Sequence, residues 1–598
     1  MSAVAPFTRD TPAGTPTGTS GRRTIDLTDP EWWKSSVVYQ VYPRSFADSD
    51  GDGVGDLRGL TSRLDHLERL GIDVIWLSPV YPSPQADNGY DIRDYRNIDP
   101  IFGTLDDFDD LLTKVHARGM KLIMDLVVNH TSDEHPWFRE SRSSVDDARR
   151  DWYWWRPPRA CFTPGQPGAE PNNWESFFGG PSWTYDNETG QYYLHLFDPK
   201  QPDLNWENPA VRQAVHETMT WWLDRGVDGF RMDVINLISK RTDLPDGARR
   251  SPEYPFGDGF PYVLNGPRVH EFLQEIYEEV FAGRREHYLT VAETPGATLD
   301  DAVLYTDPSR REVNMIFQFE HVSLDHGSHK FDGAQADPQE LVASLDRWQT
   351  GLGDRGWNSL YLGNHDQPRS VSRFGDAARY WRESSTALAT MTLLLRGTPY
   401  IYQGEELGMT NFPFDSIDQF RDIESLNYAA DAADRGLSLG AVIAGLRKGS
   451  RDNARTPMQW SAGKSAGFTS GDPWMDVNPN HSWLNAQAQY DDPASVFNYF
   501  RALVDLRHRN PVATTGRYAA VATGSPQAFA FSRTSEAGSL LVVCNLAGSQ
   551  ALWEGPPIDV TLSNYTATER RGSLLSPWEA RVYELDAKSD FPVVNRDT

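Results

Sequence analysis

Eight strand-like runs alternate with helix-like runs along most of this chain of 598 residues, and this alternation limits its possible folds more than any other feature. The first apolar run covers 37–46, and leucines at helical spacing follow it at 57–70, with Gly71 as the expected end of the helix. Thr104 is the expected N-cap of the next helix, and the eighth strand-like run begins at Thr398. Eight β/α units of this kind close into a barrel. The sequence therefore predicts an α/β fold, a TIM (β/α)8 barrel.

Three segments depart from the alternation. One is rich in Trp, Pro, Asn and Gly and is expected to be a domain inserted after the third strand. Near the C-terminus, short alternating apolar runs predict an antiparallel β-domain. The start is rich in Thr, Pro, Gly and Ala, which is typical of a disordered tail. The predicted organisation is a tail at 1–30, the barrel at 31–130 and 206–511 with a long loop at about 408–494, the inserted domain at 131–205 and the C-terminal β-domain at 512–598.

Composition excludes several classes of function. The formal net charge of −27 argues against nucleic-acid binding and against anionic membranes, which both require clustered basic residues. Only Cys161 and Cys544 are present, so no disulfide framework is expected. The N-terminal segment lacks the apolar region of a signal peptide, and no run of about 18 apolar residues could span a membrane. We therefore expect a cytoplasmic protein that acts on an uncharged small molecule.

Three carboxylates stand at the ends of three of the strand-like runs: Asp233, Glu293 and Asp366. Parallel barrels place such strand ends together at one face. Like charges brought together raise each other's pKa and oppose folding, so stability alone does not favour the arrangement. It indicates acid–base and nucleophilic chemistry on a neutral substrate. A structural alternative for one part of it is a buried ion pair between Arg231 and Asp233.

Four segments together resemble the conserved segments of the α-amylase family, glycoside hydrolase family 13. They are DLVVNH (125–130), GFRMDVIN (229–236), the Glu of TVAET (290–294) and GNHDQPR (363–369). Four more segments are similar to the oligo-1,6-glucosidase and α-glucosidase branch of that family: YQVYPRSF (39–46), QPDLNW (201–206), GTPYIYQGEELGM (397–409) and RTPMQW (455–460). The resemblance extends over roughly residues 30 to 590.

The resemblance implies catalytic roles that suit the residues. Asp233 would be the nucleophile and Glu293 the acid/base of a retaining glycosidase, whose two carboxyls lie about 5–5.5 Å apart. Asp366 would bind sugar hydroxyls and support the transition state. Arg231 lies two residues before Asp233 and so shares its strand face, where its guanidinium is expected to keep Asp233 ionised. The apolar run before Glu293 is expected to raise the pKa of that carboxyl.

The resemblance also implies a substrate pocket. His130 and His365 would bind hydroxyls of the cleaved sugar, and Tyr90 would stack on its ring. Phe178 is a candidate for the pocket wall, with plain packing as its alternative. Val234, directly after the nucleophile, resembles the residue of enzymes that cleave α-1,6 rather than α-1,4 links. The full set is Asp87, Tyr90, His130, Phe178, Arg231, Val234, His365 and Arg455, of which Asp87, Tyr90 and Arg455 would close the far end.

The segment DSDGDGVGD has the spacing of a calcium-binding loop. Its ligands would be Asp48, Asp50, Asp52, the Val54 carbonyl and Asp56, at positions 1, 3, 5, 7 and 9. Gly53 falls at the sharp turn, but Gly59 stands where such loops carry a bidentate Glu. The pattern predicts a structural Ca²⁺ site, which the resemblance also supports. A solvated acidic loop is the alternative, and the pattern does not distinguish calcium from magnesium.

The predicted function is a retaining, exo-acting α-glucosidase that prefers α-1,6 links of short oligosaccharides. Alternatives on the same scaffold are an α-1,4-glucosidase, a transglucosidase and a sucrose isomerase. Sucrose isomerases carry an Arg-rich segment after the sixth strand, where this chain reads EHVSLDHGSH. A non-catalytic relative is an alternative of another class. The three acids and the absence of a membrane-spanning run argue against it.

Overall fold

The computed structural model describes residues 25–585, apart from 328, 333–334, 435, 556–557 and 571. Most of the predicted tail at 1–30, and residues 586–598 of the predicted β-domain, lie outside this part of the chain. Within the described part, no helix combines the length and the apolar character that crossing a membrane requires.

A parallel sheet of eight strands forms the centre of the molecule, as predicted. Neighbouring strands follow one another in chain order around the sheet, and a parallel bridge between Ile316 and Asn358 joins its two ends. This closure gives the (β/α)8 barrel, whose strands are almost entirely buried because helices cover them outside. The strands are β1 (Val38–Val41), β2 (Val74–Leu77), β3 (Lys121–Val127), β7 (Gly229–Asp233), β10 (Leu289–Glu293), β11 (Met315–Phe317), β12 (Ser359–Leu360) and β13 (Thr398–Tyr402).

Local signals determine where the first helices begin and end. The helix expected at 57–70 is two helices, α1 (Leu57–Ser62) and α2 (Leu64–Leu70), broken at Arg63, whose backbone is not helical. Gly71 ends α2 in the left-handed conformation, as expected for a residue without a Cβ. Thr104 caps α3 (Leu105–Ala117) through a capping box, which confirms the predicted N-cap. Further barrel helices are α5 (Pro209–Arg225), α7 (Val269–Ile276), α8 (Leu299–Thr306), α9 (Pro338–Leu352), α11 (Trp381–Leu394) and α16 (Val496–Arg509).

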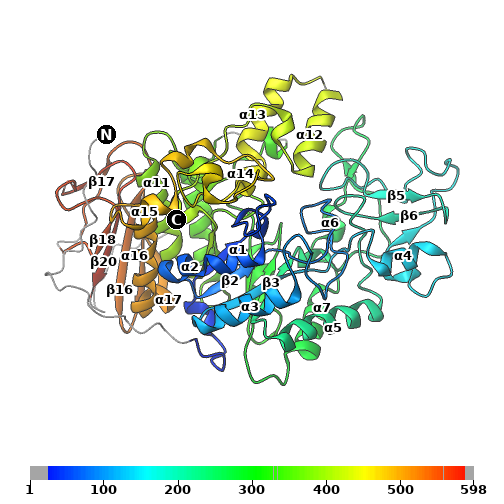
Figure 1. Cartoon of the computed structure of the whole chain (residues 1–598), viewed down its shortest axis with the longest axis horizontal. Coiled ribbons are helices and arrows are strands. Elements are labelled where there is room, and N and C mark those ends of the chain that lie inside the picture. The colour runs from blue at the N-terminus through cyan, green and yellow to red at the C-terminus, as the bar shows by residue number, and fades with distance from the viewer. Residues whose placement is uncertain are drawn as a thin grey trace.

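Between β3 and α5 the chain leaves the barrel. It forms α4 (Pro136–Ser143) and a three-stranded antiparallel sheet in the order β4 (Trp155–Arg156), β6 (Gln191–Leu194) and β5 (Trp183–Asp186). Buried aromatic rings, among them Trp154, Trp174, Trp183 and Tyr192, supply its core. These elements lie at one end of the long axis, at the right of Figure 1.

A second antiparallel sheet, near the C-terminus, lies at the opposite end of the long axis in Figure 1. Arg533 anchors this sheet to the barrel, because its buried guanidinium donates to the carbonyls of Leu394 in α11 and of Ala513, both at 2.9 Å. The order of its strands is β14 (Arg517–Val521), β15 (Ala528–Ser535), β16 (Gly538–Asn545), β20 (Ala580–Leu585) and β18 (Leu562–Ser563).

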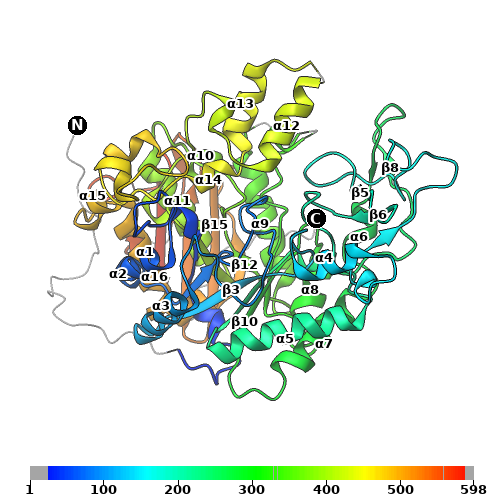
Figure 2. The ribbon, with the colours of Figure 1, turned by 45° about the vertical axis from the view of Figure 1, so that its right-hand side comes forward.

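The segment after β13, expected to be a long loop, contains helices. α12 (Ile423–Asp434) and α13 (Leu439–Gly449) project together in both views, and α14 (Asp452–Arg455) follows them (Figures 1 and 2). α12 and α13 pack on a separate small core that includes Phe331, Phe414 and Phe420. One partner ring, Phe331, comes from a distant part of the chain, whereas Phe414 and Phe420 lie just before α12.

Candidate active site

One buried guanidinium organises the acids at the barrel mouth. Arg231 in β7 lies 2.7 Å from Asp125 Oδ1 and 2.6 Å from Asp233 Oδ1, both through Nη1. Its Nη2 lies 2.5 Å from Glu293 Oε1, an ion pair whose angle does not make it a hydrogen bond. Asp233 and Glu293 are the last residues of the paired strands β7 and β10, so the barrel register itself brings these carboxylates to one cation.

Asp125 is a member of this cluster that sequence analysis did not name as a site residue. It lies directly across from Arg231 in the β3–β7 register. Its second oxygen accepts hydrogen bonds from Trp76 Nε1 at 3.1 Å and from the Tyr90 hydroxyl at 3.0 Å. The available signal was its place in the segment DLVVNH, within the buried part of β3.

Burial controls the ionisation of the two strand-end acids. It raises the pKa of Asp233 to about 7 and that of Glu293 to about 8, although Arg231 lowers both. Asp125 raises the pKa of Asp233 further, and Asp233 raises that of Glu293. The raised pKa of Glu293 matches the expectation from its apolar run. Arg231 favours ionised Asp233 as expected, but its charge is shared among three carboxylates and does not overcome burial.

Val234 has an unusual backbone. Its φ of 33° and ψ of 39° place a β-branched residue in the left-handed region, which costs about 1–3 kcal/mol. This conformation follows the end of β7, and the Val234 N–H donates to Glu293 Oε2 at 3.1 Å. The strained residue therefore helps to position the carboxyl that the sequence predicts to be the acid/base.

Two arginines hold Asp366. Its Oδ1 accepts from Arg455 Nη2 at 2.8 Å and from Arg451 Nη1 at 3.3 Å. Burial opposes the ionisation of Asp366, but His365 and these arginines more than offset it, so the pKa of this carboxyl lies well below its usual range. The buried Asp422 anchors both arginines from behind. Asp366 is also the most exposed of the three acids, at 27%, against 9% for Asp233 and 6% for Glu293.

Arg451, which sequence analysis missed, connects the far side of the site. Its Nη2 donates to Asp87 Oδ1 at 3.1 Å, and its guanidinium lies over the Phe178 ring at 5.0 Å. Asp87 Oδ2 accepts from Gln201 at 3.1 Å, and the same amide nitrogen lies 3.1 Å from His130 Nε2. The predicted residues Asp87, His130, Phe178, Arg455 and Asp366 are thus brought together. Arg451 is the N-cap of α14, four residues before Arg455.

The aromatic residues of the site stack on one another. Tyr90 lies parallel to His365, with ring centroids 5.0 Å apart and an interplanar angle of 8°. Burial lowers the pKa of His130 to about 4 and that of His365 to about 3, so both imidazoles are neutral at neutral pH. A neutral imidazole has one donor and one acceptor nitrogen, which suits the recognition of hydroxyl groups.

Comparison with known proteins agrees with this arrangement of acids. The family model of the α-amylase catalytic domain matches residues 40–516. The chain belongs to the α-amylase family. It is therefore a glycoside hydrolase.

Relatives of this α-amylase-family chain cover nearly its whole length. It is 53% identical to the oligo-1,6-glucosidase of Halalkalibacterium halodurans, over 92% of this chain and 99% of that one. The crystal structure of Bacillus licheniformis trehalose-6-phosphate hydrolase superposes with a TM-score of 0.85 at 45% identity, covering 93% of this chain and all of that one. A mutant of the isomaltulose synthase of Erwinia rhapontici, solved with sucrose, gives a TM-score of 0.86 at 40% identity, with 93% and 99% coverage.

A buried lysine ties three parts of this glycoside hydrolase together beneath the site. The Lys240 ammonium lies 2.8 Å from Asp203 Oδ2 and donates to Asn129 Oδ1 at 2.9 Å and to the Leu237 carbonyl at 2.8 Å. Asn129 follows β3, Asp203 follows the three-stranded sheet, and Leu237 follows β7. Sequence analysis did not identify this network, because its members lie up to 111 residues apart.

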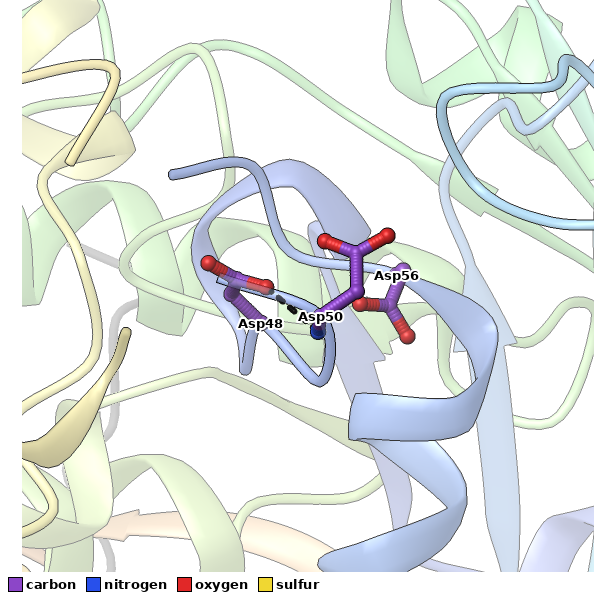
Figure 3. Close-up of side chains that lie close together, drawn as sticks. All are labelled: Asp48, Asp50 and Asp56. Carbon is purple, nitrogen blue, oxygen red and sulfur yellow. Dashed lines mark hydrogen bonds between the residues drawn. The ribbon is translucent and has the colours of Figure 1, made fainter. Parts of the chain in front are cut away.

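The acidic loop between β1 and α1 brings three of its four aspartates together. One oxygen from each of Asp48, Asp50 and Asp56 lies within 4.8 Å of the others (Figure 3). Asp52 lies outside this group. Gly53 has a φ of 95°, as expected for the sharp turn, and its N–H donates to Asp48 Oδ2 at 2.9 Å. The three carboxylates are hard oxygen donors of the kind that Ca²⁺ prefers, so the loop fits such an ion in part.

Proposed function

We propose that this chain is a retaining, exo-acting α-glucosidase that hydrolyses terminal α-1,6-glucosyl links of short oligosaccharides. The observation that carries the proposal is the sharing of one guanidinium, that of Arg231, by Asp233 and Glu293. Two carboxyls on adjacent nitrogens of one guanidinium are close enough for the covalent, retaining mechanism, which requires about 5–5.5 Å.

In the proposed reaction, a carboxylate oxygen of Asp233 forms a bond to the anomeric carbon. The bond to the glycosidic oxygen breaks, and its electron pair goes to that oxygen, which takes a proton from Glu293. Glu293 then removes a proton from water, and the water oxygen displaces Asp233. Two inversions restore the α configuration. Asp366, held ionised by Arg451 and Arg455, supports the positive charge that develops on the sugar.

Ionisation supports this division of roles. The first step needs Asp233 ionised and Glu293 protonated. The pKa of Asp233 is raised to about 7 and that of Glu293 to about 8, so the required pair of states is populated near neutral pH. The backbone N–H of Val234 also contacts Glu293 and holds it beside the nucleophile's strand.

The proposed exo action follows from the residues around Asp366. Arg451 joins Asp87 to Asp366, and its contact with Phe178 extends this barrier to the inserted segment. We infer that these side chains block a further sugar unit beyond the one bound, so release of single glucose units is expected. Rapid cutting in the middle of a long α-glucan would contradict this part of the proposal.

A single comparative assay tests the function. We would measure kcat/KM on isomaltose, maltose, sucrose and trehalose 6-phosphate, and identify the first anomer released by NMR. The proposal expects the highest value on isomaltose, with α-glucose released first. First release of β-glucose would refute the retaining mechanism. Preference for trehalose 6-phosphate, or conversion of sucrose to an isomer, would instead assign the activity of one of the structural relatives.

We further propose that the loop at Asp48, Asp50 and Asp56 holds a structural Ca²⁺, with Asp52 and the Val54 carbonyl as predicted ligands still to be tested. An ion there would tie the end of β1 to the start of α1, where Asp56 caps the helix by accepting from the Gly59 N–H at 2.7 Å. We also propose a cytoplasmic location. The free thiols Cys161 and Cys544 suit a reducing compartment, and cell fractionation would test it.

A further inference from the structure

Gln40 in β1 is a buried amide that contacts His365 at Nδ1. Its Nε2 lies 2.8 Å from His365 Nδ1 and 3.0 Å from Ser78 Oγ, while its Oε1 is buried without a hydrogen-bond partner. The residue is 1% exposed, so no solvent competes for these contacts. Neither the sequence motifs nor the proposed mechanism assign it a role.

The orientation of the Gln40 amide determines which nitrogen of His365 carries the hydrogen. With Nε2 of Gln40 toward the ring, both amide hydrogens are used and only a carbonyl lacks a partner. With the amide reversed, His365 would have to donate from Nδ1, and the amide NH2 would be buried with two unused donors. Buried unpaired donors are rarer and more costly than an under-used carbonyl. The first orientation is therefore favoured, and it makes His365 Nδ1 an acceptor.

Asp366, next to Nε2 of His365, favours the same tautomer independently of Gln40. His365 Nε2 lies 3.2 Å from Asp366 Oδ2, yet it is buried without a hydrogen bond of proper geometry. Asp366 is ionised because Arg451 and Arg455 bind it. A lone pair on Nε2 would face this anion and be repelled, whereas an N–H there is attracted and remains free to donate to a ligand.

We propose that Gln40 is a positioning residue that fixes the tautomer of His365, so that Nε2 carries the hydrogen beside Asp366 and can donate it to a hydroxyl of the bound sugar. The part of this proposal that concerns the sugar rests on the proposed function. The part that concerns the tautomer does not. Burial of the ring keeps it neutral, with its pKa lowered to about 3, so the choice of tautomer persists through neutral pH.

The first experiment needs no substrate and no variant of Gln40. The protein is labelled with ¹⁵N-histidine, and the chemical shifts of the two ring nitrogens identify the tautomer. Because the chain has 14 histidines, the His365→Asn variant serves only to assign the signal. A neutral Nε2–H tautomer between about pH 5 and 8 is expected. An Nδ1–H tautomer, or an imidazolium in that range, would overturn the proposal even if the glucosidase activity is as proposed.

The second experiment reverses the preference of His365 for the Nε2–H tautomer. In Gln40→Glu the new carboxyl, once ionised, can only accept from Nδ1–H, so the neutral ring can no longer donate from Nε2. We expect kcat/KM to fall by at least about 3- to 10-fold at neutral pH, the factor contributed by one hydrogen bond of ordinary strength. The loss should shrink as pH decreases, because an imidazolium regains Nε2–H. The titratable and charged groups that face the ring are Tyr42, Tyr90, Arg231, Asp366, Arg451 and Arg455.

Ser78→Ala is the matched control, because it removes the other contact of the same amide and leaves the contact to His365. It should keep the Nε2–H tautomer and the wild-type pH profile. A Gln40→Glu protein that folds, as judged by its melting temperature, and keeps the wild-type profile would refute the proposal. If that variant does not fold, the tautomer measured in the wild-type protein decides. Absence of glucosidase activity in the wild type would refute the proposed function instead.

Discussion

Replacing Arg231 by Leu should destabilise the protein by an amount that depends on pH. The guanidinium is fully buried and binds Asp125, Asp233 and Glu293 at 2.5–2.7 Å. Removing one partner of a buried charge cluster costs about 3–5 kcal/mol, which is a large part of the stability of a typical domain. Three carboxylates would then be left without their shared cation. The cost is expected only where these carboxylates are ionised.

The pKa values of the three acids determine whether the destabilisation by Arg231→Leu grows or shrinks as pH rises. Burial raises the pKa of Asp125 to about 6, of Asp233 to about 7 and of Glu293 to about 8. A carboxyl whose pKa is higher in the folded state stabilises the fold below its unfolded pKa, and this stabilisation is lost as pH rises through the folded pKa. Arg231 lowers all three pKa values, so its removal raises them further. The difference between wild type and variant should therefore be small near pH 5 and largest above about pH 8.

Melting temperatures of Arg231→Leu and of wild type, measured by calorimetry across this pH range, test the reasoning. Arg231→Lys is the control, because it keeps a charge but cannot bind several carboxylates with a planar fork. The melting temperature of Arg231→Lys should lie between those of wild type and Arg231→Leu. In active samples of the leucine variant, the acidic limb of kcat/KM should move to higher pH, because Asp233 ionises less readily. A difference in melting temperature that is the same at pH 5 and pH 8 would refute the argument.

Three further predictions test other parts of the site. Glu293→Gln should lower kcat/KM on isomaltose by about 10²- to 10⁴-fold but affect an aryl α-glucoside less, because an aryl leaving group needs little protonation; equal losses on both would contradict its role as the acid. Val234→Ala should lower the isomaltose-to-maltose ratio of kcat/KM by up to about 10- to 200-fold, the range for one or two methyl groups, and an unchanged ratio would exclude Val234 as the linkage determinant. Chelation of calcium should lower the melting temperature of the wild type but not of Asp48→Asn, with KM unchanged in both; a wild-type melting temperature that chelation leaves unchanged would count against the calcium site.

Periodicity and end signals in the sequence were sufficient to predict the barrel. Strands of a parallel barrel are buried on both faces and therefore read as apolar runs, and their order along the chain is also their order in the sheet. Gly71 and Thr104 end and begin their helices through local backbone chemistry, so they too were predictable. The helices α12 and α13 were not predicted, and the core on which they pack includes Phe331, which is distant in the sequence.

The strand-end acids Asp233 and Glu293 were predictable, because a strand's last residue always lies at the same face of a barrel. Their ionisation was not. The sequence places Arg231 beside Asp233, but only the tertiary structure shows that the same guanidinium also binds Asp125 and Glu293, and that burial outweighs its charge. Desolvation and Coulomb interactions depend on distances between strands, which no local pattern contains. For the same reason Arg451 and Gln40 became evident only in three dimensions.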